Sequence, residues 1–423
     1  MSRWRHLLHL ALAVMLFVAA SSRAHTQVVL DPTAEFFDGS VLHELRLWIN
    51  SRDWETLKTN FLSNDYYPAD LKWNATTVPN IGIRSRGNGS RSGFKPGLRV
   101  DIDRYASGQR FLGLKSFVLR NNTQDPSQMH EWLSMLFFKR MGLPASREAF
   151  ARLFVNDQYA GLYTIVESVD KSFLTRQFGE DSGYLFDYDY PANAAPYYFE
   201  DRGRNPASYV PLPFKPETNE NNSRPEVIAD MVQAINASSS AVFRSAVAEF
   251  IDLGQFIRHV ATEVFLADQD GIVGEWGMNN FFMYRPQFSN LFRLIVWDKS
   301  QAFVMGQAYP IWHNITDVPG ANRNRLMNRA LEYPDLRAVY LDTLLEAGRA
   351  ASEVPVNTLP GDTRGWLERE IDRAYALIAP SVLADTLKPY TNDEFVASVE
   401  ALRVFARERT TFVNADVAAS LTP

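Results

Sequence analysis

The chain of 423 residues contains 43 Lys and Arg against 49 Asp and Glu, which gives a formal net charge of −6. This acidic balance disfavours nucleic acid as a partner, because phosphate binding needs clustered Lys and Arg. The sequence has no cysteine, and its histidines beyond the first ten residues are widely separated. Disulfides are therefore excluded and a zinc site is disfavoured. The 28 Phe, 17 Tyr and 9 Trp are enough for one large hydrophobic core or for two smaller ones.

The first 24 residues have the pattern of a cleavable export signal. Arg3 and Arg5 precede an apolar run, 7–20, and mostly small residues then lead to Ala24. The apolar run is shorter than the roughly 20 residues that a membrane-spanning helix needs. We therefore predict cleavage after Ala24, with Ala20 as the next-best position. The mature chain is expected to have no permanent membrane span and to be secreted, periplasmic or located at the cell surface.

Strand patterns dominate the chain up to residue 170. Short apolar or alternating runs bounded by turn residues predict strands, and turn residues between the last two runs predict a hairpin. Apolar residues at helical spacing between Pro126 and Gly142 predict one prominent helix. The predicted elements are strands at 41–50, 81–86, 98–102, 150–155 and 160–166, a short helix from Asp53, and a helix over 127–141.

Helical patterns dominate the remainder of the chain. Thr391 followed by Glu394 forms the sequence pattern of a capping box before a further apolar helix. The chain is therefore expected to be α+β, with strands first and helices afterwards. The predicted parts are a β-rich part at 25–170 and a mostly helical part at 171–423, with helices at 229–235, 241–250 and 256–266 and a long irregular connection at 191–225.

Acidic and amide side chains gather around one loop of the helical part. Asp268, Asp270 and Asn280 precede two strands within 281–297, and the second strand ends at Asp298. If these strands pair as a hairpin, Asp298 returns beside the loop. Such a cluster suits a hard divalent cation that holds phosphates, with one carboxylate to accept a proton from an attacking hydroxyl. The same residue types are also common in turns and caps without any catalytic role, so both interpretations remain open.

The glycine-rich segment Gly87–Gly93 joins two predicted strands rather than opening a helix, which disfavours a dinucleotide-binding fold. Its backbone N–H groups are suited to covering phosphates, and Arg84, Arg86, Arg91 and Lys95 add positive charge around it. The alternative is a flexible hairpin turn with a solvated basic edge. The chain contains neither G-x-S-x-G nor G-K-[ST], so hydrolase and Walker-type functions lose their usual support.

An ordered set of segments resembles the spore coat protein H (CotH) family of atypical, secretory-type protein kinases. The resemblance extends from about Arg84 to Phe303, and the order of the segments is far more specific than any one of them. The segments are RGNGSR at 86–91, FLGLK at 111–115, NNTQDP at 121–126, VNDQYAGLY at 155–163, VESVDK at 166–171, NFFMYR at 280–285 and VWD at 296–298.

The resemblance implies a two-lobed protein-kinase-like fold, with a β-rich N-terminal lobe and a mostly helical C-terminal lobe. It implies ATP with Mg²⁺ or Mn²⁺ as cofactors and a protein Ser or Thr hydroxyl as the phosphoacceptor. In the roles that the family implies, Asp298 and Asn280 bind the metal and Asp270 is the catalytic acid that accepts the hydroxyl proton. The implied ATP-binding residues are Gly87, Asn88, Gly89, Ser90, Lys95, Arg99, Glu131, Glu167 and Val169.

Within this ATP-binding set, the resemblance implies three different tasks. The glycine-rich turn covers the phosphates. Arg99 or Lys95 neutralises the α and β phosphates and pairs with Glu131 on the following helix. The segment from Glu167 to Val169 contacts the adenine.

Two other functions remain open. Ser300 replaces the second metal-binding acid of the family, Asp101 replaces an expected Lys, and nine residues separate Asp270 from Asn280 where the family often has about four. These departures favour a catalytically weak or inactive pseudokinase that serves as a surface or extracellular binding protein. The third function is a carbohydrate-active protein that uses the acids of this cluster as paired carboxylates.

Overall fold

The computed structural model describes residues 31–189, 195–237, 239–356 and 358–421. The predicted export signal at 1–24 lies outside these residues. Among the helices of the described residues, none is long and apolar enough to cross a membrane.

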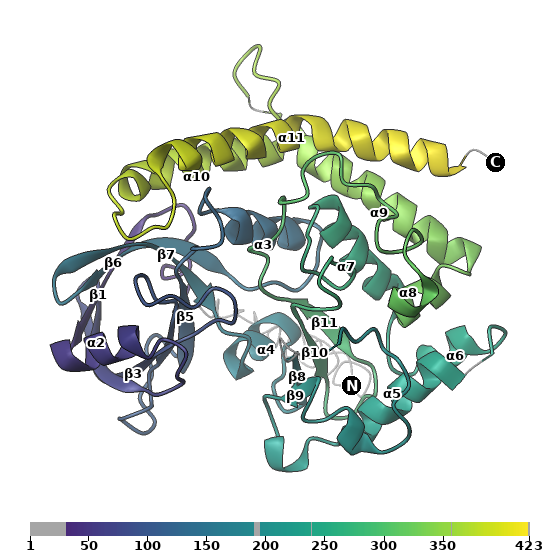
Figure 1. Ribbon diagram of the computed structural model, residues 1–423, viewed down its shortest axis with the longest axis horizontal. Coiled ribbons are helices and arrows are strands. Elements are labelled where there is room, and N and C mark those ends of the chain that lie inside the picture. Colours follow the sequence, from purple (N-terminus) through teal and green to yellow (C-terminus); the bar gives the residue numbers. More distant parts are fainter. Residues whose placement is uncertain (1–30, 190–194, 238, 357, 422–423) are drawn as a thin grey trace, which may run out of the picture.

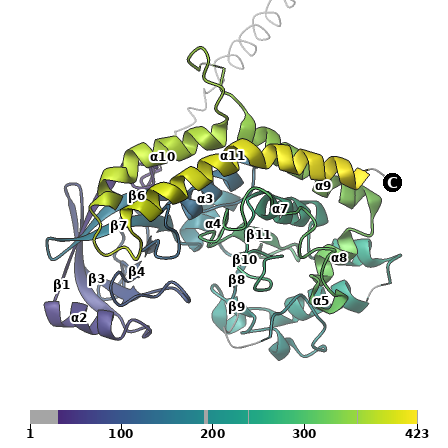
Figure 2. The ribbon, with the colours of Figure 1, turned by 45° about the horizontal axis from the view of Figure 1, so that its top comes forward.

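Seven strands close into a barrel (Figure 1; Figure 2). Neighbouring strands pair in the order β1, β2, β3, β4, β5, β7, β6. The pairs are antiparallel except that of β1 with β6, which is parallel and closes the barrel. The strands are β1 (His43–Ile49), β2 (Tyr67–Trp73), β3 (Thr76–Ser85), β4 (Leu98–Asp101), β5 (Ser116–Arg120), β6 (Glu148–Val155) and β7 (Gln158–Glu167).

Alternate residues of these strands fill the barrel interior. In β1 every second residue is buried, as the period of two in a strand requires, and Leu45 and Leu47 enter one cluster with the inward residues of the other strands. Phe36, which precedes β1, joins the same cluster, and its ring lies edge-on to Trp73 at 5.3 Å and to Phe117 at 5.1 Å. Full burial of a large apolar side chain stabilises the folded state by about 1.5–3 kcal/mol. These interior side chains are therefore the main source of the barrel's stability.

The connections within the barrel follow the turn residues of the sequence. Asn156 and Asp157, both at positive φ, form the tight turn between β6 and β7, a conformation that these two residue types tolerate. The strands β3 and β4 pair across the glycine-rich segment. The predicted hairpin of β6 and β7 is therefore confirmed, as is the prediction that the glycine-rich segment joins two strands. Two helices lie among these strands in the chain, α2 (Ser51–Thr59) and α3 (His130–Arg140).

A second, four-stranded antiparallel sheet lies beside the barrel (Figure 1). Its strand order is β11, β10, β8, β9, and the predicted hairpin within 281–297 is confirmed by the pairing of β10 with β11. A small apolar cluster joins this sheet to the barrel, because it contains Val118 and Val166 of the barrel together with Phe282 of β10 and Trp297, which follows β11. The strands are β8 (Tyr184–Tyr188), β9 (Phe214–Pro216), β10 (Phe281–Arg285) and β11 (Arg293–Val296).

Helices cover the remaining faces. Figure 1 shows α10 and α11 running together across the top of the molecule, above the barrel and α3, while α9 lies between α7 and α11. The buried Arg409 of α11 fixes this layer, because its guanidinium donates to the carbonyl oxygens of Phe265 at 2.9 Å and Val264 at 2.7 Å. The helices are α4 (Lys171–Phe178), α5 (Pro225–Ala237), α6 (Phe243–Val247), α7 (Leu253–Phe265), α8 (Arg325–Ala330), α9 (Pro334–Ser352), α10 (Trp366–Leu383) and α11 (Asn392–Leu421).

The start of α11 agrees with the sequence in atomic detail. The Glu394 carboxylate accepts the Thr391 N–H at 2.7 Å, and the Thr391 hydroxyl accepts the Glu394 N–H at 3.1 Å. This reciprocal pair is the predicted capping box.

The chain is mixed α/β, as predicted, but two expectations need correction. The helix expected at 241–250 extends only over α6, and the irregular connection expected at 191–225 contains β9, which pairs with β8. The predicted β-rich part contains the closed barrel. The remaining predicted helices, at 127–141, 229–235 and 256–266, correspond to α3, α5 and α7.

Candidate functional site

Asn280 and Asp298 lie at the same end of the β10–β11 hairpin. Phe281 is the register partner of Val296, and the Trp297 N–H donates to the Asn280 carbonyl oxygen at 3.2 Å. Both Asn280 and Asp298 have positive φ, of 62° and 45°, a conformation that is uncommon for residues other than glycine. The backbone therefore turns away from the sheet at both positions and leaves both polar side chains at its edge.

Asp270 joins them from the preceding loop. Its carboxylate accepts hydrogen bonds from Asn279 at 3.0 Å and from Asn280 at 2.8 Å. Burial, aided by the neighbouring charges of Asp268 and Asp298, raises the pKa of Asp270 to about 7, against the opposing hydrogen bond from Asn279. The long loop thus folds back so that the amide of Asn280 touches Asp270, and Asp270 is a carboxyl group that exchanges its proton near neutral pH.

Asp298 is held by Arg120 at the end of β5. The Arg120 Nη1 donates to Asp298 Oδ2 at 2.6 Å, and the Ser300 hydroxyl donates to Oδ1 at 3.1 Å. Burial alone would raise the pKa of Asp298, but the charges of Arg120 and Arg86 and these hydrogen bonds keep it below its usual value. With 27% of its side chain exposed, Asp298 is an ionised carboxylate that a ligand can reach.

Arg120 also contacts Glu131 on α3, with 2.5 Å between Nε and Oε2. The expectation that Arg99 or Lys95 pairs with Glu131 is wrong, because Arg120 occupies that place. Burial raises the pKa of Glu131 to about 7 in spite of the Arg120 charge. Arg120 is consequently the link between the carboxylate on α3 and the one that follows β11.

Two arginines lie over the indole ring of Trp297. The guanidinium carbons of Arg86 and Arg120 are 5.0 Å and 5.2 Å from the ring centroid, distances within the range of cation–π attraction. Trp297 belongs to the same apolar cluster as Val169. Charged, aromatic and aliphatic groups thus meet where the barrel adjoins the second sheet.

A cavity opens beside Arg120, between the glycine-rich segment and α3. Both Glu131 and Ser300 contribute to its wall, so it extends to the neighbourhood of Asp298. The other lining residues come from the connection between β3 and β4, which includes the glycine-rich segment, from β4 and β5, and from the loop after β5: Arg86, Ser90, Gly97, Leu98, Val118, Leu119, Arg120, Asn121, Asn122, Thr123, Gln124 and Asp125.

The glycine-rich segment is held in one conformation by side chains around it. Gly87 has φ of +122°, which only glycine adopts readily, and its carbonyl oxygen accepts from Arg91 Nε at 2.7 Å. The Asn121 amide donates to the Ser90 carbonyl oxygen at 2.9 Å. Asn88 and Gly89 are exposed at the tip. The tip therefore projects from a fixed base.

The other predicted ATP-binding residues lie around this region in different settings. Lys95 is fully buried against Asp385, and neither it nor Arg99 lines the cavity. The Glu167 carboxylate is buried and accepts from Arg147 at 2.7 Å and from Arg176 at 2.7 Å. The roles that the resemblance implies for these residues stay predictions.

Asp268 is removed from solvent behind the loop. Lys299 Nζ donates to Asp268 at 2.9 Å and to Glu263 on α7 at 2.7 Å, and the side chains of all three are buried. Burial alone would raise the pKa of Glu263, but the Lys299 charge and the neighbouring His259 lower it to about 2. This arrangement makes Asp268 a structural partner of Lys299 and disfavours its use as one of two exposed catalytic carboxylates.

The side-chain oxygen ligands of this site fit a divalent cation that is already bound to phosphates. Within the described part of the chain, no group of three or more His, Cys, Asp or Glu side chains is gathered closely enough to hold a metal ion. Asp298 and Asn280 offer hard oxygen ligands at one edge. Mg²⁺ is commonly bound by one or two protein ligands and completed by phosphate oxygens and water. The residues present are sufficient for that mode of binding.

Arg120 and Lys299 were not found from the sequence. Arg120 directly precedes the segment NNTQDP at 121–126, and Lys299 directly follows the segment VWD at 296–298. Both segments belong to the family resemblance. The available signal for Arg120 was the apolar run Phe117–Leu119, which ends directly at this arginine, but that strand was not predicted.

Taken together, the chain is a mixed α/β protein in which a network of arginines and carboxylates adjoins a glycine-rich turn between two strands. The family model described as CotH kinase protein matches residues 83–413, which is more than half of the chain. The chain belongs to this family, as the resemblance predicted.

Two curated proteins are among its relatives. The chain is 24% identical over 371 residues to the inner spore coat protein H of Bacillus subtilis (strain 168), covering 87% of this chain and 95% of that protein. It is 26% identical over 267 residues to Invasin CotH3 of Rhizopus delemar, covering 57% of this chain and 42% of that protein. The second match thus spans less than half the length of the relative.

Two solved structures are similar at 10% identity. One is the Helicobacter pylori proinflammatory kinase CtkA, with a TM-score of 0.31, covering 74% of this chain and 94% of that one. The other is the Shewanella oneidensis MR-1 toxin–antitoxin system of HipA, HipB and operator DNA, with a TM-score of 0.33, covering 76% of this chain and 60% of the matched one. TM-scores this low carry no argument about how this chain works.

Proposed function

We propose that this chain is an exported kinase, which transfers the γ-phosphoryl group of ATP to a Ser or Thr hydroxyl of a protein with the aid of Mg²⁺ or Mn²⁺. The observation that supports this most directly is the convergence of Asp270, Asn280 and Asp298 at one edge, with Arg120 joining Asp298 to Glu131. Phosphoryl transfer depends mainly on positioning and charge neutralisation. These residues supply both.

In this proposal Asp298 and Asn280 hold the cation, which neutralises charge on the phosphates. Asp270 accepts the proton of the substrate hydroxyl as its oxygen bonds to the γ-phosphorus and the bond to the β-phosphate oxygen breaks. The pKa of Asp270, raised to about 7 by burial, suits a group that must accept and then release a proton near neutral pH. The barrel and the helical part correspond to the two lobes of a kinase, at 25–170 and 171–423.

The glycine-rich turn of Gly87, Asn88, Gly89 and Ser90 is proposed to cover the phosphates through its backbone N–H groups. Arg120, with Arg86 beside it, supplies the positive charge that the resemblance placed on Lys95 or Arg99. The segment from Glu167 to Val169 is proposed to contact the adenine, since Val169 shares an apolar cluster with Trp297.

The test is a phosphate-transfer assay on the purified chain without residues 1–24, with labelled ATP and Mg²⁺ or Mn²⁺. Wild type is compared with Asp298→Ala and Asp270→Asn, and autophosphorylation and a generic protein substrate are both followed. We expect labelling in wild type and a loss of about 100-fold or more in each variant, since each removes a group that acts directly on the reacting phosphate or proton. Equal labelling in all three proteins would sink the proposal.

The second candidate is a pseudokinase that serves as a surface or extracellular binding protein. Its support is that Ser300, in place of a second acid, donates to Asp298, while Arg120 occupies the other oxygen of that carboxylate. A thermal-shift titration with ATP and Mg²⁺ separates the two, because a ligand that binds the native state raises Tm. No shift at millimolar ATP favours the binding protein.

A secreted, periplasmic or cell-surface location is part of the proposal. Export removes the usual supply of ATP, so the kinase needs ATP or another phosphoryl donor in that compartment. Fractionation of cells that express the full chain, with N-terminal sequencing of the exported product, tests both the location and cleavage after Ala24. A chain retained in the cytoplasm with residues 1–24 intact would contradict this part.

A further inference from the structure

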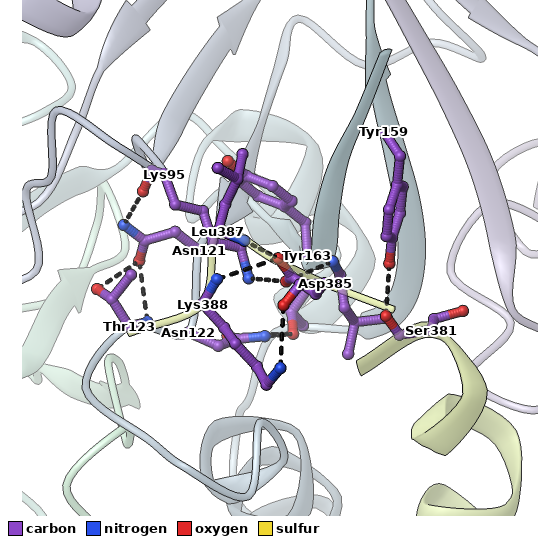
Figure 3. A network of polar contacts seen from close by, with 12 residues as sticks. Lys95, Asn121, Asn122, Thr123, Tyr159, Tyr163, Ser381, Asp385, Leu387 and Lys388 are labelled. Carbon is purple, nitrogen blue, oxygen red and sulfur yellow. Dashed lines mark hydrogen bonds and ion pairs between the residues drawn. The ribbon is translucent and has the colours of Figure 1, made fainter. Parts of the chain in front are cut away.

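Asp385 connects the C-terminal helices to the barrel. It follows α10, and its Oδ2 accepts from Lys95 Nζ at 2.7 Å and from the Leu162 N–H of β7 at 3.1 Å (Figure 3). Its Oδ1 accepts from the N–H groups of Leu387 and Lys388 at 2.9 Å and 3.1 Å. The side chains of Lys95 and Asp385 are 0% and 1% exposed. A carboxylate with four donors in a dry setting has one well-defined position.

The barrel is shaped to admit this carboxylate. Gly161 in β7 has φ of +113°, and a Cβ at this position would lie 2.4 Å from Asp385 Oδ2. Glycine at this point therefore allows the close approach that Lys95 and Leu162 need in order to donate to the same oxygen. The contact therefore depends on a residue from each part: Gly161 in the barrel and Asp385 in the segment after α10.

Lys95 lies two residues after the glycine-rich segment and holds the end of that segment, the base of the turn, in place. The Asn121 amide donates to the carbonyl oxygens of both Lys95, at 2.7 Å, and Ser90, at 2.9 Å. The next residue is fixed as well, because the Tyr163 hydroxyl donates to the Pro96 carbonyl oxygen at 3.1 Å. Ser90 and Asn121 line the cavity beside Arg120. A displacement of Lys95 would therefore reach the cavity through Asn121.

A second contact from the same C-terminal segment reaches the cavity wall. The Tyr390 hydroxyl donates to the carbonyl oxygen of Thr123, which lines the cavity. The segment between α10 and α11 thus touches both the base of the turn, through Asp385, and the loop that faces the turn, through Tyr390.

We propose that Asp385, acting through Lys95, is a positioning residue for the glycine-rich turn, so that the segment between α10 and α11 sets how tightly the candidate site binds nucleotide. Lys95 serves in this assembly as the anchor of the turn. The part concerning nucleotide rests on the proposed kinase function. The part concerning the position of the turn does not.

Two substitutions remove the contact. Asp385→Asn keeps the shape but leaves the Lys95 ammonium buried without its counter-charge. Lys95→Met with Asp385→Asn removes both charges, so it avoids an unpaired buried charge and serves if the single variant does not fold. Tyr159→Phe is the matched control, because it removes a 2.8 Å hydrogen bond between β7 and Ser381 of α10 without touching Lys95.

Hydrogen–deuterium exchange of residues 87–97 in the full exported chain measures the position of the turn without nucleotide. We expect exchange about tenfold faster in Asp385→Asn and in the double variant, and no change in Tyr159→Phe, since local opening is governed by local contacts. Unchanged exchange in a folded double variant would overturn the proposal.

The second measurement is the dissociation constant for ATP with Mg²⁺, with KM and kcat where labelling occurs. For Asp385→Asn we expect the dissociation constant and KM to rise about tenfold while kcat stays within about twofold, because the catalytic groups at Asp270 and Asp298 are untouched and only the binding geometry is loosened. Faster exchange with unchanged ATP affinity would contradict the role in nucleotide binding. If wild type binds no ATP but exchange behaves as expected, the kinase function fails and the positioning role stands.

Discussion

Arg120 bridges two carboxylates that come from opposite sides of the candidate site, with its Nη1 2.6 Å from Asp298 Oδ2 and its Nε 2.5 Å from Glu131 Oε2. The Arg120 side chain is 8% exposed and the Glu131 side chain 5%. A planar fork of donors is well suited to hold two acids at once. The barrel, α3 and the strand end after β11 are thus joined by a single side chain.

Arg120→Ala is expected to destabilise the fold by about 3–5 kcal/mol, because it removes the counter-charge that contacts the buried Glu131 and leaves only the charge of Arg86 near it. Urea denaturation at pH 8, where both carboxyls tend to ionise, gives the free energy of unfolding. Arg46→Ala is the control, since Arg46 forms a similar pair of contacts with Glu44 and Asp157 on the surface, and we expect no measurable change. A loss in Arg120→Ala no larger than that of the control would show that the bridge does not support the fold.

The pH dependence of phosphate transfer should follow Asp270. A general base must be ionised, and the pKa of Asp270 is about 7 because of burial, so the rate should rise as pH increases through about 7 and level off above it. Initial rates from pH 5.5 to 9 at saturating ATP and metal measure this profile. A rate that is flat over this range would exclude Asp270 as the proton acceptor.

The same group predicts a pH effect on stability. The folded-state pKa of Asp270 lies above its usual value of 3.8, so the folded chain binds more protons than the unfolded chain between those two pH values, and Asp270 lowers stability as pH rises through about 7. Asp270→Asn should consequently gain stability relative to wild type at pH 8 compared with pH 5. Tm of both proteins at the two pH values gives the comparison, and a constant difference would contradict it.

The sequence predicted the local structure where turn and cap residues leave few choices. Thr391 with Glu394, Asn156 with Asp157, and the strand that ends at Asp298 were placed correctly because each depends on neighbours in the chain. The hairpin alone was enough to predict that Asp298 lies beside Asn280.

Contacts between distant segments could not be predicted in this way. Closure of the barrel depends on the parallel pairing of β1 with β6. The strand β2 was missed because Pro68 and its polar residues obscure the alternation, and β5 because its short apolar run is buried throughout and has no alternation. Arg120 lies at the end of one of these missed strands. Its pairing with Glu131 was therefore assigned to Lys95 or Arg99, whereas Lys95 pairs with Asp385, 290 residues further along the chain.

Lys299→Met tests the buried cluster behind the candidate site. The Lys299 ammonium lies between Asp268 and Glu263, and its loss leaves two buried carboxylates together, at a cost of about 3–5 kcal/mol. The free energy of unfolding should fall by this amount, whereas Lys58→Met, in an exposed pair with Glu55, should change it by about 0.5 kcal/mol or less. Adding Asp268→Asn should recover part of the loss, because it removes one of the two repelling charges. A double variant no more stable than Lys299→Met would contradict the repulsion.

Gly161→Ala tests how tightly the barrel closes around Asp385. A Cβ at Gly161 would lie 2.4 Å from Asp385 Oδ2, whereas a Cβ at Gly142, which also has positive φ, meets nothing within 4 Å. Gly142→Ala should therefore lose only the backbone preference of glycine, about 1 kcal/mol, and Gly161→Ala should lose about 1–3 kcal/mol more through the steric clash.

Making Gly161→Ala in a chain that also carries Asp385→Ala shows whether the clash with this carboxylate causes the loss of stability. Asp385→Ala removes the carboxylate with which the new Cβ collides, so the cost of Gly161→Ala should fall to the backbone preference for glycine at φ of +113°, and the two changes should be non-additive by about 1–3 kcal/mol. Urea denaturation of the four proteins of this cycle measures the coupling. Simple additivity would mean that β7 can move away from Asp385 without loss, and the close packing of Gly161 against the carboxylate would then contribute nothing to the position of Lys95.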